Sequence, residues 1–147
     1  MSVEIVNETE FEIDDTEFLD AASYCMRQLQ VHPDAELAVL FVDEEAMAEL
    51  HKRWMNLDGP TDVMSFPMDE LRPGHPEASG ILGDIVICPQ VAEAQAAEAK
   101  HTLAEEMLLL MIHGLLHLLG YDHMRAGERA EMFALQRRLF LTFLAQK

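Results

Sequence analysis

The stretch His113–His123, which reads His-Gly-Leu-Leu-His-Leu-Leu-Gly-Tyr-Asp-His, carries three histidines in eleven residues. On an α-helix, residues four apart lie on the same face one turn apart, so His113 and His117 can converge on one cation. Gly120 follows, where a glycine with positive φ can end the helix and let the chain bring His123 to the same point. Three neutral imidazoles leave the fourth position of a tetrahedral zinc ion open, which is typical of a catalytic site. The sequence therefore predicts one Zn²⁺, with His113, His117 and His123 as its ligands.

The residue after the first histidine separates this stretch from a known class of zinc site. The spacing H-x3-H-x2-G-x2-H is that of the metzincin proteases, which carry a glutamate directly after the first histidine as general base. Here that position is Gly114. The predicted ligands are kept and the protease base is absent, which argues against peptide hydrolysis.

The helix that carries the first two histidines has a clear beginning. Thr102 and Glu105 have the Thr-x-x-Glu spacing of a capping box, so we expect a helix from 102 to 119. Its interior is apolar nearly all round, which is typical of a buried central helix.

The rest of the chain predicts an α+β fold, in which helices pack on a small mixed β-sheet. With the histidine spacing that resembles the metzincins, we expect this fold to be zincin-like. No linker or repeat divides it, so we expect a single domain over 1–147. The strand at 61–67 ends in Pro67, which places it at a sheet edge. We expect strands over 2–7, 36–42, 61–67 and 81–88, and helices over 16–30, 43–54, 89–100, 102–119 and 127–144.

Composition restricts the partners and the compartment. The formal net charge of -17 argues against broad electrostatic binding of nucleic acid, so any RNA chemistry must rely on a local patch and on the charge of the metal. The cysteines, Cys25 and Cys88, lack metal-type spacing and are expected to be buried free thiols in a reducing cytosol. No signal peptide is visible, and the longest apolar stretch, 107–121, is too short to span a bilayer. We therefore expect a cytoplasmic protein with no membrane partner.

Three motifs together resemble one known family. They are residues 60–67 (Pro-Thr-Asp-Val-Met-Ser-Phe-Pro), residues 83–85 (Gly-Asp-Ile) and the histidine stretch. In this order they resemble the YbeY family of bacterial rRNA maturation factors and endoribonucleases, over roughly Glu36 to the end of the chain. The resemblance implies a metal-dependent, single-strand-specific endoribonuclease with zinc as the usual metal and no organic cofactor. It also implies a role in small-subunit rRNA maturation and ribosome quality control, with an rRNA precursor and small-subunit components as partners.

The resemblance assigns roles to some of the site residues and leaves one position unmatched. His113, His117 and His123 match the metal ligands of the family one for one. Many members carry an arginine five residues before the proline of Pro-Thr-Asp, and here that position is Met55. Arg53, two residues earlier, is the candidate to replace it as a catalytic phosphate clamp.

The remaining site candidates each have a structural alternative. Asp122 is a candidate base or an orienting partner of a ligand, and equally a turn residue. Asp84 is a candidate second-shell partner or a turn residue. Ser65 and Phe66 could present backbone groups to an extended substrate, or simply face solvent and core. Three further basic side chains could neutralise a phosphate group or be plain surface charges: Lys52, Arg72 and Arg125. The other histidines are expected at the surface: His32, His51, His75 and His101.

Three functions therefore compete. The leading hypothesis is a zinc-dependent endoribonuclease in rRNA processing. The second is another zinc hydrolase, a peptidase or amidase, against which Gly114 speaks. The third is a non-catalytic ribosome-assembly factor with a structural zinc, which the acidic charge and Met55 favour.

Overall fold

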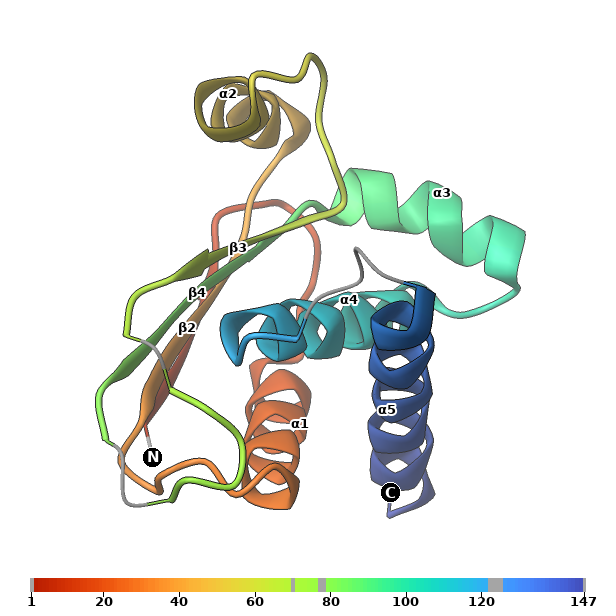
Figure 1. The fold of residues 1–147 in the computed structure, drawn as a ribbon. Helices are drawn as coiled ribbons and strands as arrows, with labels where there is room; N and C mark the ends of the chain where they lie inside the picture. The colour runs from red at the N-terminus through yellow and green to blue at the C-terminus, as the bar shows by residue number, and fades with distance from the viewer. Residues whose placement is uncertain (1, 70, 77–78, 122–125, 147) are drawn as a thin grey trace.

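The computed structural model describes residues 2–69, 71–76, 79–121 and 126–146, which form a four-stranded sheet and five helices (Figure 1). The α+β class and the order of elements expected from the sequence are confirmed. Each bound lies within two residues of its expected position. The elements are β1 (Ser2–Asn7), α1 (Asp15–Gln28), β2 (Glu36–Phe41), α2 (Glu44–Met55), β3 (Val63–Pro67), β4 (Ile81–Ile87), α3 (Pro89–Ala99), α4 (Leu103–Leu118) and α5 (Ala126–Ala145).

The sheet is mixed, as expected. Its strand order is β1-β2-β4-β3, with β1, β2 and β4 parallel and β3 antiparallel to β4. The prediction that the strand ending in Pro67 lies at an edge is confirmed. An edge suits this residue because proline has no backbone N–H to give to a neighbouring strand.

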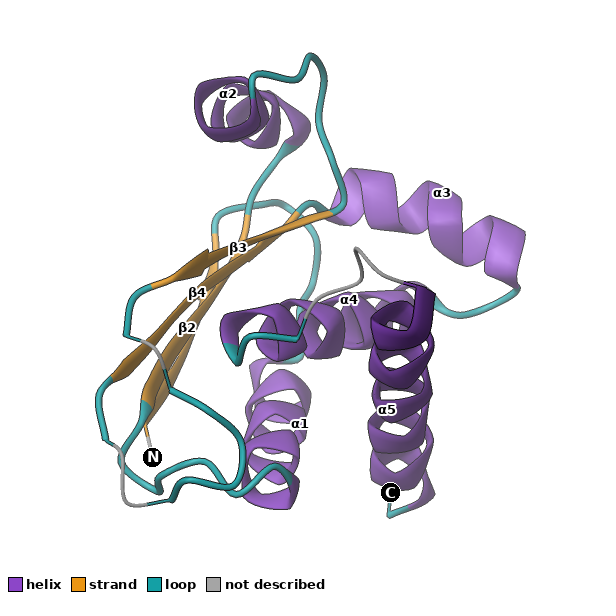
Figure 2. Ribbon diagram, in the orientation of Figure 1, coloured by secondary structure: helices purple, strands orange, loops and turns teal. Residues whose placement is uncertain are grey.

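Helices cover the two faces of the sheet unequally (Figures 1 and 2). Helices α1, α4 and α5 lie on one side and enclose the main core, in which the Phe18 and Phe41 rings meet edge to face at 5.0 Å. On the other face, Met47 and Leu50 of α2 belong to a smaller apolar cluster with Val86 of β4. This second face is open beyond α2, with exposed Glu36 and Asp84 side chains.

Helix α4 lies at the centre, as its apolar sequence predicts. The capping box is present in full: Glu105 N–H donates to Thr102 Oγ1, and Thr102 N–H donates to Glu105 Oε1. The helix approaches the sheet closely at Gly114, where an added Cβ would lie 2.9 Å from Ile85 Cγ2 and 3.0 Å from Ser65 Oγ. Ser65 Oγ donates to Gly114 O at 3.1 Å, so β3 and α4 are fixed to one another at this point.

Two further expectations can be compared with the structure. Cys25 and Cys88 are both free thiols and both buried. Among the helices of the described ranges, none has the length and apolar content needed to cross a bilayer.

Candidate active site

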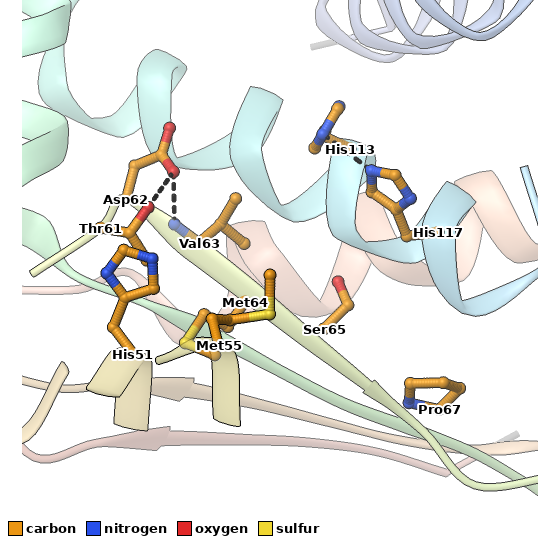
Figure 3. Close-up of a pocket in the computed structure, with 10 residues that line it drawn as sticks. All are labelled: His51, Met55, Thr61, Asp62, Val63, Met64, Ser65, Pro67, His113 and His117. Atoms are coloured by element: carbon orange, nitrogen blue, oxygen red, sulfur yellow. Dashed lines mark hydrogen bonds between the residues drawn. The ribbon is translucent and has the colours of Figure 1, made fainter. Parts of the chain in front are cut away.

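A cleft of about 510 Å³ lies between β3, α4 and the C-terminal end of α2 (Figure 3). Antiparallel β3 forms one wall, and α4 forms the other. The chain between α2 and β3 closes one end. The lining residues are His51, Met55, Thr61, Asp62, Val63, Met64, Ser65, Pro67, His113 and His117.

The two histidines of α4 face each other inside this cleft. His113 Nε2 and His117 Nε2 are 3.1 Å apart, and the rings meet edge to face with centroids 4.6 Å apart. Two nitrogen ligands of one tetrahedral zinc lie about 3.3 Å apart, because each zinc–nitrogen bond is about 2.0–2.1 Å long. Both side chains are half-buried, which limits the motion of the rings while keeping them accessible from the cleft. The pair therefore fits two positions of a tetrahedral metal ion.

Helix α5 contacts the part of the His113 ring that faces away from His117. Gln136 Oε1 lies 2.7 Å from His113 Nδ1, and the Phe133 ring lies nearly parallel to the imidazole, at 16° and 6.0 Å between centroids. Sequence reasoning missed both residues. Their i, i+3 spacing places them on one helix face, but nothing in the sequence shows which other element that face meets.

The third predicted ligand, His123, and the candidate base Asp122 lie outside the described residues. Within the ranges that the structure describes, no group of three histidine, cysteine or acidic side chains could hold a metal. The three-histidine set therefore stays a prediction, supported by two of its members.

The structure separates the two predicted substrate-binding residues. Ser65 lines the cleft and bonds to α4. The half-buried Phe66 belongs to the apolar cluster under α2, where its ring meets Trp54 edge to face at 5.8 Å. Successive side chains of a strand point to opposite faces, so of these two residues only Ser65 faces the histidines.

Two candidates are not brought to the cleft. Asp84 is exposed and lines a separate hollow with Glu4 and Glu36. Its neighbours Gly83 and Ile85 face α4, so alternation along the strand turns Asp84 to the other face. The expectation that Asp84 contacts a histidine ligand is therefore corrected. Arg53 lines a hollow on the far side of α2 and lies over the Trp54 ring at 5.6 Å.

The reason for the second correction is helical geometry. Met55 lines the cleft, and two residues along a helix correspond to a rotation of about 200°, so Arg53 cannot replace it there. The other described basic candidates have partners elsewhere: Lys52 Nζ pairs with Asp58 at 3.3 Å, and an Arg72 guanidinium nitrogen donates to Leu119 O at 3.5 Å. Arg125 lies outside the described residues.

Three polar residues of the cleft, His51, Thr61 and Asp62, were missed as site candidates. His51 was expected at the surface, but it is half-buried and lines the cleft, with Nδ1 2.8 Å from Gly59 O. A carbonyl oxygen only accepts, so Nδ1 carries the hydrogen and Nε2 is left as an acceptor. Asp62 accepts from Val63 N–H at 2.7 Å and from Gln95 Nε2 at 3.1 Å, so its carboxylate is held against the end of β3. The Pro-Thr-Asp motif was the available signal for Asp62.

A buried acid flanks the same wall. Glu106 of α4 is 7% exposed, and its Oε1 lies 3.5 Å from His101 Nδ1. Burial raises the pKa of the Glu106 carboxyl; the nearby His101 acts in the opposite direction, and Asp62 raises the pKa further. Helix α4 therefore carries, two turns before His113, an acid that favours its protonated form more than an exposed glutamate does.

Comparisons with known proteins show the family of the chain. A model of the family described as Endoribonuclease YbeY matches residues 4–143. A protein named Endoribonuclease YbeY from Beutenbergia cavernae is 57% identical, over 99% of each chain. Another of that name from Bifidobacterium animalis subsp. lactis is 58% identical, over 99% of this chain and 81% of its own length. The solution structure of TM1509 from Thermotoga maritima matches with a TM-score of 0.66 and 27% identity, over 98% of this chain and 90% of that one.

Proposed function

The chain belongs to the YbeY endoribonuclease family, and from this premise we propose that it is a zinc-dependent endoribonuclease that cuts single-stranded RNA. We propose that it acts in small-subunit rRNA maturation and ribosome quality control in the cytoplasm. Its substrate would be an rRNA precursor, and its partners would be components of the small subunit. The whole of 1–147 would be one domain with a zincin-like site. The support for this proposal is the family match together with the chemistry of the cleft.

The observation that supports metal dependence is the short distance, 3.1 Å, between the Nε2 atoms of His113 and His117. In the absence of a cation, two imidazole nitrogens at this distance need a hydrogen between them. A zinc ion held by His113, His117 and His123 would act as a Lewis acid on a phosphoryl oxygen and would make a bound water more acidic.

The chain's own residues would bind and orient the RNA. Ser65 and the outer edge of β3 form the wall along which an extended strand can lie. His51, with its Nδ1 hydrogen held by Gly59 O, offers Nε2 to a ribose hydroxyl or to a water molecule. Met55 and Met64 give the same cleft an apolar side that suits an unstacked base.

The packing at Gly114 weakens the peptidase alternative. A metzincin glutamate would occupy this position, and the space here is too small even for a Cβ without a shift of Ile85 or Ser65. Presenting that base to a peptide would therefore require this contact between α4 and the sheet to open.

The test compares cleavage of a labelled single-stranded RNA by the wild type, His117→Ala and His75→Ala, each purified with zinc. His75 is exposed in a loop outside the cleft and serves as the matched control. We expect cutting by the wild type and by His75→Ala, and at least a hundredfold loss in folded His117→Ala, because the metal supplies several kcal/mol of transition-state stabilisation.

Equal cutting by all three proteins, or by none, would contradict the nuclease proposal. The second outcome would favour the assembly factor with a structural zinc, which the net charge of -17 also favours. Chelation separates the two, since a structural zinc is needed for folding itself. We expect the chelated wild type to keep its helical circular dichroism and lose only its activity.

A further inference from the structure

Gln136 of α5 contacts the outer nitrogen of His113. The two atoms, Gln136 Oε1 and His113 Nδ1, are 2.7 Å apart, which is a short and well-formed hydrogen bond. An amide oxygen can only accept, so this contact places the hydrogen on Nδ1 of the imidazole. His113 Nε2, which faces His117, is then left with its lone pair toward the cleft.

We propose that Gln136 is a positioning residue of the active site, which holds His113 in the one neutral tautomer that can bind a metal through Nε2. This inference rests on the proposed metal site. A ligand histidine commonly donates its other ring N–H to a fixed acceptor, which sets both the tautomer and the ring orientation.

A second contact from the same helix face supports this role. Phe133, one turn before Gln136, lies nearly parallel to the His113 ring at 6.0 Å between centroids. The amide fixes the imidazole at one edge, and the phenyl ring restricts it at one face. Two contacts in different directions hold the ring orientation better than either alone, and both come from α5 rather than from the helix that carries the histidine.

The role can be tested without metal and without RNA. Long-range proton–nitrogen NMR spectra of the metal-free protein, at a pH at which imidazoles are neutral, report the tautomer of each histidine, and His113→Gln identifies the signal. We expect the Nδ1–H tautomer of His113 in the wild type and in Gln136→Glu, which keeps an acceptor oxygen. In Gln136→Leu the Nε2–H tautomer should become substantially populated, because Nδ1 loses its acceptor. Arg137→Leu places the same residue at the neighbouring exposed position and should leave the spectrum unchanged.

The affinity for Zn²⁺ alone provides a second readout, measured by competition with a chromogenic chelator. We expect a 10–100-fold weaker Kd in Gln136→Leu, the usual cost of removing such a partner, and recovery in Gln136→Glu. If the leucine variant does not fold, Gln136→Asn withdraws the oxygen by one methylene and should show the same loss.

The inference is wrong if wild-type His113 carries its hydrogen on Nε2, or if Gln136→Leu keeps the wild-type tautomer. An equal effect of Arg137→Leu would also overturn it, because the effect would then come from α5 as a whole. A wild type that binds no Zn²⁺ would overturn the proposed function instead, while the tautomer would still decide the role of Gln136.

Discussion

At the scale of the residue, Glu106 shows how burial and charge act on one carboxyl beside the cleft. The pKa of Glu106 is raised, mainly because the carboxyl is buried. A group with a raised pKa in the folded state stabilises the protein most at low pH, and this stabilisation is lost as pH rises through that pKa. Glu106→Gln removes the ionisation. We therefore expect the variant to be no more stable than the wild type near the usual glutamate pKa and increasingly more stable toward neutral pH. Thermal unfolding across this pH range measures the difference.

The control for this experiment is Glu93→Gln, at an exposed position of α3. It removes one negative charge at a surface position, so the comparison separates the effect of the buried position from that of the charge lost. If the relative stability of Glu106→Gln falls as pH rises, the pKa of Glu106 is not raised, and His101 stabilises the ionised carboxyl more than burial opposes it.

Cys25 gives a second prediction, at alkaline pH. Burial raises its pKa from 9.0 to about 12, so its contribution to stability is complete below pH 9 and decreases as pH rises toward 12. Between about pH 8 and about pH 10.5 the wild type should lose about 2 kcal/mol relative to Cys25→Ala, at about 1.4 kcal/mol per pH unit above the unfolded pKa. Urea unfolding of both proteins at these pH values measures the loss. A constant difference between them would show that Cys25 does not titrate with a raised pKa.

At the scale of the element, the contact between α4 and the sheet depends on Gly114. Gly114→Ala places a Cβ 2.9 Å from Ile85 Cγ2, and overpacking of this kind costs about 1–3 kcal/mol, which exceeds the gain of about 1 kcal/mol from better helix propensity. We expect stability to fall by up to about 2 kcal/mol and the hydrogen bond from Ser65 to α4 to weaken. Denaturant unfolding measures the stability change.

Gly127 is the matched control, because it is also helical, in α5, and an added Cβ there meets nothing within 4 Å. Gly127→Ala should therefore raise stability by up to about 1 kcal/mol. If both glycine variants were stabilised, the close approach at Gly114 would not restrict the helix.

The elements themselves could be predicted from the sequence because their signals are local. The capping box at Thr102, the proline at the end of β3 and the apolar periods depend only on neighbouring residues. The i, i+4 spacing was likewise enough to bring His113 and His117 together. The expected role of Asp84 beside a histidine ligand was wrong, because it was inferred from the Gly-Asp-Ile motif. The alternation of side chains along the strand would have shown that Asp84 lies on the other face.

The rest of the site could not be predicted, because it depends on contacts between distant elements. Gln136 is 23 residues from His113, and no local pattern shows that α5 packs at this point of α4. His51 enters the cleft only because the chain after α2 returns to form β3, which places Gly59 O beside its ring. Such contacts are set by tertiary packing, which sequence periods do not encode.

At the scale of the whole molecule, the net charge of -17 determines how an anionic substrate approaches. Most nucleic-acid-binding proteins lose affinity with salt because cationic side chains release counterions. Here long-range repulsion opposes the encounter, and salt screens it. We therefore expect the cleavage rate at low RNA concentration to rise, by a few-fold, between low and near-physiological ionic strength.

The control is a variant with Glu8, Glu10 and Glu12 changed to glutamine, all of them in the acidic N-terminal region. It should cut faster than the wild type at low salt and respond less to added salt. A wild-type rate that falls steadily with salt would show that a local cationic site dominates over the net charge.

The contacts of α5 also connect the candidate site to parts of the chain that are distant in sequence. Tyr24 Oη of α1 donates to Thr142 Oγ1 of α5 across 118 residues, and Gln136 meets His113 across 23. A local opening that releases α5 therefore has two effects at once. It removes the hydrogen-bond partner of His113, and it exposes the buried side chains of Leu139 and Phe140.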